Sequence, residues 1–177
     1  MTLAVELVEE QLSVRAIHRL VGGLPEGFDL LAALEEHFEN VGEVSVEASV
    51  LDRMVDEGAL CLVRPEGQGV LLRPRPETVA AAEFDLDSSR LEVALRDLPA
   101  GHEVTYQHGW DHVSAAVGKG EAQAGVLIRP ATVAQILEVG RSRTLMPQKT
   151  TFFYPKPVTG LVMRRLDAWR PVAAFAR

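Results

Sequence analysis

Three short apolar runs in this sequence end in the dipeptide Arg-Pro, at Arg64-Pro65, Arg73-Pro74 and Arg129-Pro130. Proline lacks a backbone N–H and cannot sit in the middle of a sheet, so each dipeptide predicts the end of a strand. Residues 59–63 and 69–72, the first two runs, flank a short loop with Pro65 and Gly67, which predicts a β-hairpin. The runs are irregularly spaced and therefore do not indicate a repeat architecture.

Helical and strand patterns are interspersed along the rest of the chain. Asp29 opens an amphipathic pattern with Leu30, Leu31, Leu34 and Phe38 on one face, and Asp87 or Ser88 is placed to cap a helix that runs to Leu98. Further helices are predicted at 48–57, at 111–117 and from Pro130 onward. Further strands are predicted at 3–8, 14–21, 43–46, 103–107, 124–128 and 160–166. This mixture predicts an α+β fold with a mixed, largely antiparallel sheet and helices packed on it.

Length and composition predict one globular α+β domain over residues 1–177, or two small lobes at about 1–85 and 86–177. The chain has 177 residues, 47% of them hydrophobic, which is enough to form a core that needs no disulfide bonds or structural metal. No apolar run is long enough to span a bilayer, and the acidic N-terminus does not resemble a signal peptide. The single cysteine, Cys61, lies in an apolar strand and is predicted to be buried. These features predict a cytoplasmic protein without a membrane partner.

Charge is distributed unevenly over the two ends of the chain. Residues 1–140 carry 10 basic and 24 acidic side chains, whereas residues 141–177 carry 8 basic side chains and one acidic side chain. The acidic first part argues against nucleic-acid binding, because phosphates are repelled by its field. The basic end is suited either to bind one phosphate or carboxylate or to pack against the acidic body.

Residues 141–159 combine cations, hydroxyl groups and prolines in one segment. The cations Lys149 and Lys156 supply point charges, and the hydroxyl groups of Thr150, Thr151 and Tyr154 supply directed hydrogen bonds. Prolines stiffen such a segment. The segment therefore predicts either a clamp for a small anionic metabolite or a crossover whose aromatic side chains fill the core.

The sequence lacks the standard phosphate-loop, zinc and serine-nucleophile motifs, so it names no cofactor and predicts no metal site. Histidine titrates near neutral pH and can move a proton, which makes His18 and His108 candidates for a general base. His108 and His112 are four residues apart, but Gly109 disfavours the continuous helix that a chelating pair needs.

The segment Met146–Pro157, followed by Thr159-Gly160-Leu161-Val162, resembles the C-terminal signature of a prokaryotic family called domain of unknown function ten-fifteen. Residues 16–21, 106–108 and 126–130 also resemble segments of that family. Family members are about twice as long, and their N-terminal half carries a Gly-His-His-Arg motif similar to that of ParB-like and sulfiredoxin-like proteins. This chain lacks that motif. The resemblance therefore implies that the chain corresponds to the C-terminal half of such a protein.

The resemblance also implies a function. It suggests phosphoryl transfer on a small anionic metabolite at a composite site, with a nucleotide and magnesium if the full-length protein is a kinase. The missing N-terminal half or the second copy in a homodimer would complete the site. The predicted anion-binding residues are Lys149, Thr150, Thr151, Tyr154, Lys156, Arg19 and Arg129, with His18 or His108 as general base. The alternative function is a non-enzymatic interaction or regulatory module.

Overall fold

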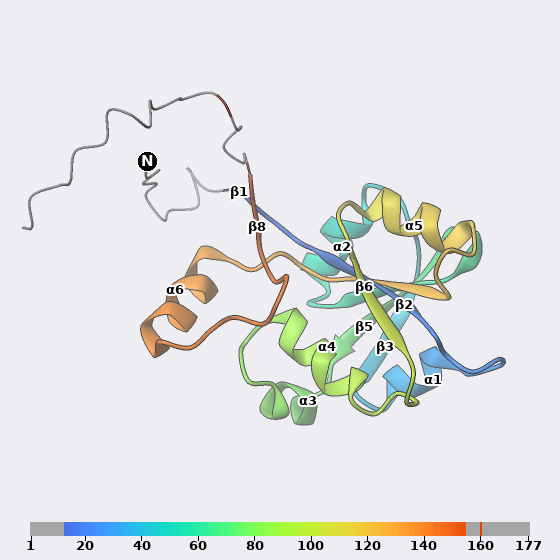
Figure 1. Cartoon of the computed structure of the whole chain (residues 1–177), viewed down its shortest axis with the longest axis horizontal. Coiled ribbons are helices and arrows are strands. Elements are labelled where there is room, and N and C mark those ends of the chain that lie inside the picture. Colours follow the sequence, from blue (N-terminus) through green and yellow to red (C-terminus); the bar gives the residue numbers. More distant parts are fainter. Residues whose placement is uncertain (1–12, 155–159, 161–177) are drawn as a thin grey trace, which may run out of the picture.

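The computed structural model describes residues 13–154 and Gly160. The strands are β1 (Ser13–Arg15), β2 (His18–Gly22), β3 (Phe38–Ser45), β4 (Leu60–Val63), β5 (Gln68–Pro74), β6 (Glu103–Gln107), β7 (Ala124–Leu127) and β8 (Phe152–Tyr154). The α-helices are α1 (Leu30–Glu35), α2 (Val50–Asp56), α3 (Pro76–Ala81), α4 (Asp87–Leu95), α5 (Trp110–Gly118) and α6 (Val133–Ser142), and a 3₁₀ turn spans Pro65–Gly67. Figure 1 shows this arrangement.

The central sheet has the strand order β3-β5-β4-β7-β2-β6, and each of its pairings is antiparallel. A separate antiparallel ribbon joins β1 to β8, with Ser13 opposite Tyr154 and Arg15 opposite Phe152. The predicted α+β class with a largely antiparallel sheet is therefore confirmed. The predicted hairpin is also present as β4 and β5, in which Val63 pairs with Gly69.

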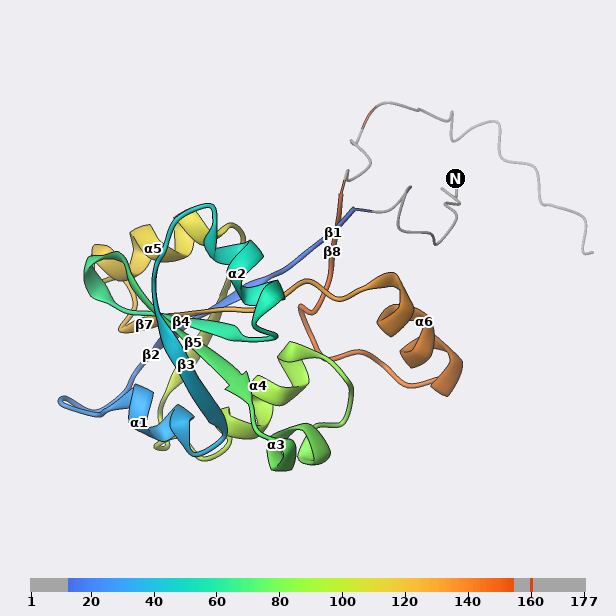
Figure 2. The same ribbon diagram turned by 180° about the vertical axis from the view of Figure 1, so that it is seen from behind.

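Helices cover both faces of the sheet, as Figures 1 and 2 show. On one face, Leu34 of α1 and Leu91 of α4 pack against alternate strand residues such as Leu62. On the other face, Met54 of α2 and Val113 of α5 pack with Cys61, Val63 and Leu127. Burial raises the pKa of the Cys61 thiol to about 12, so this cysteine behaves as the buried apolar residue that the sequence predicted.

The three Arg-Pro dipeptides lie at strand ends, as predicted. β4 ends one residue before Arg64, β5 ends at Pro74, and β7 ends two residues before Arg129. Each arginine contacts a carboxylate: Arg64 pairs with Glu43, Arg73 with Glu57, and Arg129 with Asp87. The arginines thus tie strand ends to neighbouring elements.

Some element boundaries differ from the predictions. Helix α1 ends at Glu35, and Phe38 begins β3 opposite Pro74 instead of extending the helix. A residue four positions after Leu34 fits a helical stripe as well as a buried strand position, so spacing alone did not separate the two. Helix α6 begins at Val133, and Thr132 with Gln135 forms a capping box there. The predicted strands 3–8 and 160–166 lie outside the described residues, apart from Gly160.

Among the described residues, no helix has the length and apolar character needed to cross a membrane.

The central sheet combines strands from the two candidate lobes on either side of residue 85, because β4 pairs with β7.

Close packing between β7 and α5 leads to a stability prediction. A Cβ added at Gly125 would lie 2.3 Å from Cγ1 of Val113, which is itself fully buried. We expect Gly125→Ala to lower the free energy of unfolding by about 1–3 kcal/mol through overpacking. The matched control is Gly140→Ala on exposed α6, where a Cβ meets nothing within 4 Å; it should raise stability by up to about 1 kcal/mol. Urea unfolding of both variants measures the difference, and equal stabilities would contradict the packing argument.

Candidate functional site

A cavity of about 560 Å³ lies where the β1–β8 ribbon meets the central sheet and the helices α2 and α5. Its lining includes Arg15 of β1, His18 of β2, Val55 of α2, His108 after β6, Trp110 of α5, Arg129 after β7 and Phe152 of β8. The cavity is in the size range of small-molecule sites and combines apolar walls with a few polar groups. It brings together His18, His108 and Arg129, three of the residues that the sequence singled out.

A glycine turn places two aromatic rings at this cavity. Gly109 has a φ of 78°, and a Cβ there would lie 2.6 Å from Oδ1 of Asp111. Glycine adopts such a φ without a steric cost. The turn carries His108 on one side and Trp110 on the other, and the His108 ring packs against Phe152 with 4.4 Å between centroids. Strand β6, helix α5 and the ribbon therefore converge on one wall.

His18 is a buried, neutral imidazole. Its side chain is 3% exposed, and its Nδ1 accepts a hydrogen bond of 3.2 Å from the backbone N–H of Ile128. Burial, together with the nearby charges of Arg19 and His108, lowers the pKa of His18 to about 4. Because Nδ1 is an acceptor, the neutral ring carries its proton on Nε2. His18 is thus arranged to donate a hydrogen bond, and this geometry favours His108 as the candidate for a general base.

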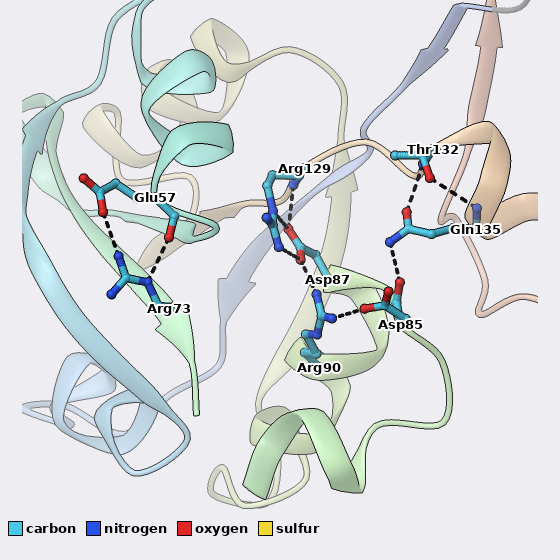
Figure 3. Close-up of polar contacts among 8 residues, drawn as sticks. All are labelled: Glu57, Arg73, Asp85, Asp87, Arg90, Arg129, Thr132 and Gln135. Carbon is cyan, nitrogen blue, oxygen red and sulfur yellow. Dashed lines mark hydrogen bonds and ion pairs between the residues drawn. The ribbon is translucent and has the colours of Figure 1, made fainter. Parts of the chain in front are cut away.

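Arg129 is fixed at the cavity by the buried carboxylate of Asp87 (Figure 3). Nε and Nη2 of Arg129 donate to the two oxygens of Asp87 at 2.9 and 2.7 Å, and the backbone N–H of Arg129 donates to Oδ2 at 3.0 Å. These hydrogen bonds raise the pKa of Arg129. Asp87 also accepts from Arg90, which pairs in turn with Asp85. Within residues 13–154 no acceptor meets Nη1 of Arg129, so this edge of the guanidinium remains available.

The position of Asp87 corrects the capping prediction. Helix α4 begins at Asp87, the preceding Leu86 offers no side-chain cap, and the Asp87 carboxylate turns to Arg129 instead. Pairing two otherwise buried charges outweighs a cap bond, because an unpaired arginine at this half-buried position would cost more than a missing cap. A sequence pattern does not reveal this long-range pairing.

Thr150 lines a second, smaller cavity of about 220 Å³ that adjoins the first at Arg129. Its hydroxyl donates to the carbonyl of Pro147 at 2.8 Å and lies 3.2 Å from the hydroxyl of Ser88. The predicted anion-binding hydroxyl therefore has internal partners that hold residues 147–150 against α4. Thr151, the next residue, is half-buried.

The remaining predicted anion-binding residues lie apart from one another. Arg19 is 4% exposed, faces the ring of Tyr106 at 4.7 Å and donates to the carbonyls of Ile17 and Lys149. Burial lowers the pKa of Arg19. Lys149 itself is exposed, with a positive φ of 56°. Neither residue lines the cavity, so the structure brings the Lys149 backbone, and not its ammonium group, next to Arg19.

On the ribbon, Tyr154 is exposed and supports Arg15, whose guanidinium lies 4.3 Å from the centre of the Tyr154 ring. Lys156 lies outside the described residues. Arg15, Asp87 and Trp110 were not singled out as site residues by the sequence. The only hint was the Gly109-Trp110 pair next to His108, since glycine before an aromatic residue allows a sharp turn beside it.

The Arg129 network leads to a stability prediction. We expect Asp87→Asn to lower the free energy of unfolding by about 3–5 kcal/mol, because it leaves two arginines without a buried counter-charge. The control is Asp85→Asn, whose carboxylate is 75% exposed and pairs with Arg90; exposed pairs contribute less than about 1 kcal/mol. Urea unfolding at neutral pH compares the variants. Similar losses for both would contradict a special role of Asp87.

The depressed pKa of His18 predicts a pH-dependent stability. The folded value is about 4 against 6.5 for an unperturbed histidine, so the unfolded chain binds this proton first as the pH falls. His18 therefore leaves stability unchanged above pH 6.5, lowers it between pH 6.5 and about 4 by roughly 3 kcal/mol in total, and adds no further loss below that.

Unfolding measured across this pH range tests the prediction for His18. His18→Asn, which keeps an acceptor for Ile128, should remove that part of the slope. The exposed control His112→Asn should retain it. An NMR titration of the His18 ring with a midpoint near 6.5 would contradict the assignment.

Comparisons with known proteins place the fold. No family model matches the chain, and no curated protein matches it. A solved structure of a free serine kinase variant in complex with AMP is similar, with a TM-score of 0.54 and 14% sequence identity. A conserved hypothetical protein from Pyrococcus furiosus is similar at the same TM-score and identity. The first match covers 84% of this chain and 56% of that one, and the second covers 84% and 59%. The chain thus shares its fold with these proteins and spans a little more than half of their length.

Proposed function

We propose that the larger cavity binds a small metabolite through a phosphate or similar anionic group, and that the chain contributes this site to phosphoryl transfer. The observation that carries the proposal is the convergence of Arg15, Arg129 and the His18 donor on one cavity. Asp52 is the one carboxylate residue in that lining. In a chain with a net charge of −7, a cavity with two guanidinium groups is a local site for a negative ligand.

Each polar group has a distinct role in this proposal. Asp87 binds one edge of the Arg129 guanidinium and fixes this cation beside the cavity, which preorganises the site for an anion. Arg15 lines the same cavity, is exposed on the ribbon and forms no ion pair within the described part of the chain, so its charge is available to the ligand. The Nε2–H of His18 donates to a ligand oxygen, and His108 accepts a proton from an attacking hydroxyl.

The basic segment after α6 extends the site in this proposal. Arg19 holds the Lys149 turn through its carbonyl, and Thr150 anchors the same turn to α4. Lys149, Thr151 and Lys156 would then meet the distal part of a larger phosphate ligand, and Tyr154 would keep Arg15 in place. These roles rest on the composition of the segment and on its attachment beside Arg129.

A composite site agrees with the length comparison. We propose that the chain is related to the family called domain of unknown function ten-fifteen, and that a further part of a longer protein or a second copy completes the site. Some of the fold neighbours are described as a free serine kinase in complex with AMP or ADP, which supports a nucleotide as a ligand of the complete site. In that arrangement magnesium would enter with the nucleotide.

An interaction module is the second candidate function. Strands β3 and β6 form the two edges of the central sheet, and Tyr106 on β6 is 44% exposed. An edge strand offers unpaired backbone groups to another strand. This favours strand addition by a partner and predicts no response of the cavity to small anions.

Phosphate titration followed by NMR separates the two functions. We expect inorganic phosphate and AMP to shift the signals of His18, His108 and Trp110 at millimolar ligand. Arg15→Gln should weaken binding by about tenfold or more, because a charge-assisted hydrogen bond contributes about 1.5–3 kcal/mol. The matched control is Arg53→Gln, an exposed arginine of α2 outside the cavity lining. Signal shifts confined to the Lys149 turn would indicate that the anion binds to the basic segment and not in the cavity. Unchanged spectra would contradict anion binding.

A further inference from the structure

Aromatic and aliphatic side chains form much of the wall of the larger cavity. Trp110 and Phe152 come from α5 and β8, and Leu51 and Val55 come from one side of α2. The polar groups Arg15 and Arg129 lie in the same lining. The cavity therefore offers two kinds of surface to one ligand: cations for an anionic group and apolar walls for whatever the anionic group is attached to.

The aromatic content of this wall is unusual for the chain. Aromatic residues make up only 6% of the sequence, which contains two tryptophans in total. The cores on the two faces of the sheet are mainly aliphatic, with Phe38 as the one aromatic residue among their fully buried members in the described structure. Trp110 is half-buried, and it both lines the cavity and packs against the core on the face of α2 and α5. This scarce, large ring therefore takes part in the core and also supplies aromatic surface to the cavity wall, where a ligand can contact it.

Helix α2 supports the same interpretation. Val50 and Met54 are fully buried and hold the helix on the sheet, whereas Leu51 and Val55 are 37% and 61% exposed. Both exposed side chains line the cavity. A flat apolar ligand would cover these aliphatic side chains and remove their surface from water, which is favourable. A small hydrated ion would leave the same surface in contact with water. A bare anion would leave this surface uncovered.

We propose that the cavity selects a ligand with an aromatic ring attached to its anionic group, and that Trp110 and Phe152 contact the ring. The inference rests on the proposed anion-binding function and adds the substrate class. The anionic group meets Arg15 and Arg129, while the ring lies against the aromatic wall and is covered by Leu51 and Val55. No hydrogen bond involves the Trp110 indole N–H in the part of the chain that the structure describes, so it is available to a polar atom of the ring.

Matched ligands test this selectivity. The protein carries Trp169→Phe so that the single indole N–H signal belongs to Trp110, and dissociation constants are measured by NMR for inorganic phosphate, butyl phosphate, phenyl phosphate, phenylacetate and AMP. We expect phenyl phosphate and AMP to bind on the order of tenfold more tightly than butyl phosphate, as ring stacking on aromatic side chains does elsewhere. The comparison of phenyl phosphate with phenylacetate decides whether the anionic group is a phosphate or a carboxylate.

Variants assign the preference to the wall. Trp110→Leu and, independently, Phe152→Leu should remove most of the tenfold preference while inorganic phosphate still binds within about twofold of its original affinity. Phe84→Leu is the control, because Phe84 lines a separate cavity beside α6; it should keep the preference. Equal affinities for phenyl and butyl phosphate would overturn the inference and leave anion binding intact. Absence of binding for every ligand would overturn the proposed function as well.

Discussion

The ion pair between Asp87 and Arg129 holds together the parts of the molecule on which the site depends. It connects the first residue of α4 to the chain just after β7, where Arg129 lines both adjoining cavities. A buried charge is tolerated in a fold only when an opposite charge pairs with it. Asp87 pairs with Arg129 at the end of the strand and also with Arg90. The same pairing leaves one edge of Arg129 directed away from Asp87. One interaction therefore serves both the packing of the sheet and the polarity of the cavity.

The two faces of strand β2 carry basic residues in different charge states, and only His18 lines the cavity. His18 lies on the side of α2 and α5, is neutral, and has its acceptor nitrogen occupied by the backbone of the neighbouring strand. Arg19 points to the other side and keeps its charge among carbonyl groups and the Tyr106 ring. Alternation along a strand thus separates a hydrogen-bond donor for the cavity from a cation that supports a loop. Adjacent residues in the sequence act at different places.

Local patterns predicted much of the sheet and many of the helices, because the signals for a hairpin, an Arg-Pro strand end or an amphipathic helix are each contained in a short stretch of sequence. They also selected His18, His108 and Arg129, which the fold brings to one cavity. They did not predict that residues 152–154 form a strand with 13–15, since that pairing joins opposite ends of the chain. Nor did they separate a cap from a long-range ion pair at Asp87. Contacts distant in sequence account for these differences.

The β1–β8 ribbon has a geometric consequence for the cavity. Ser13 lies opposite Tyr154, so two positions far apart in the sequence lie side by side, close to Arg15 and Phe152 of the cavity lining. A change that weakens either strand of the ribbon would therefore also shift the part of the cavity wall that Arg15 and Phe152 form.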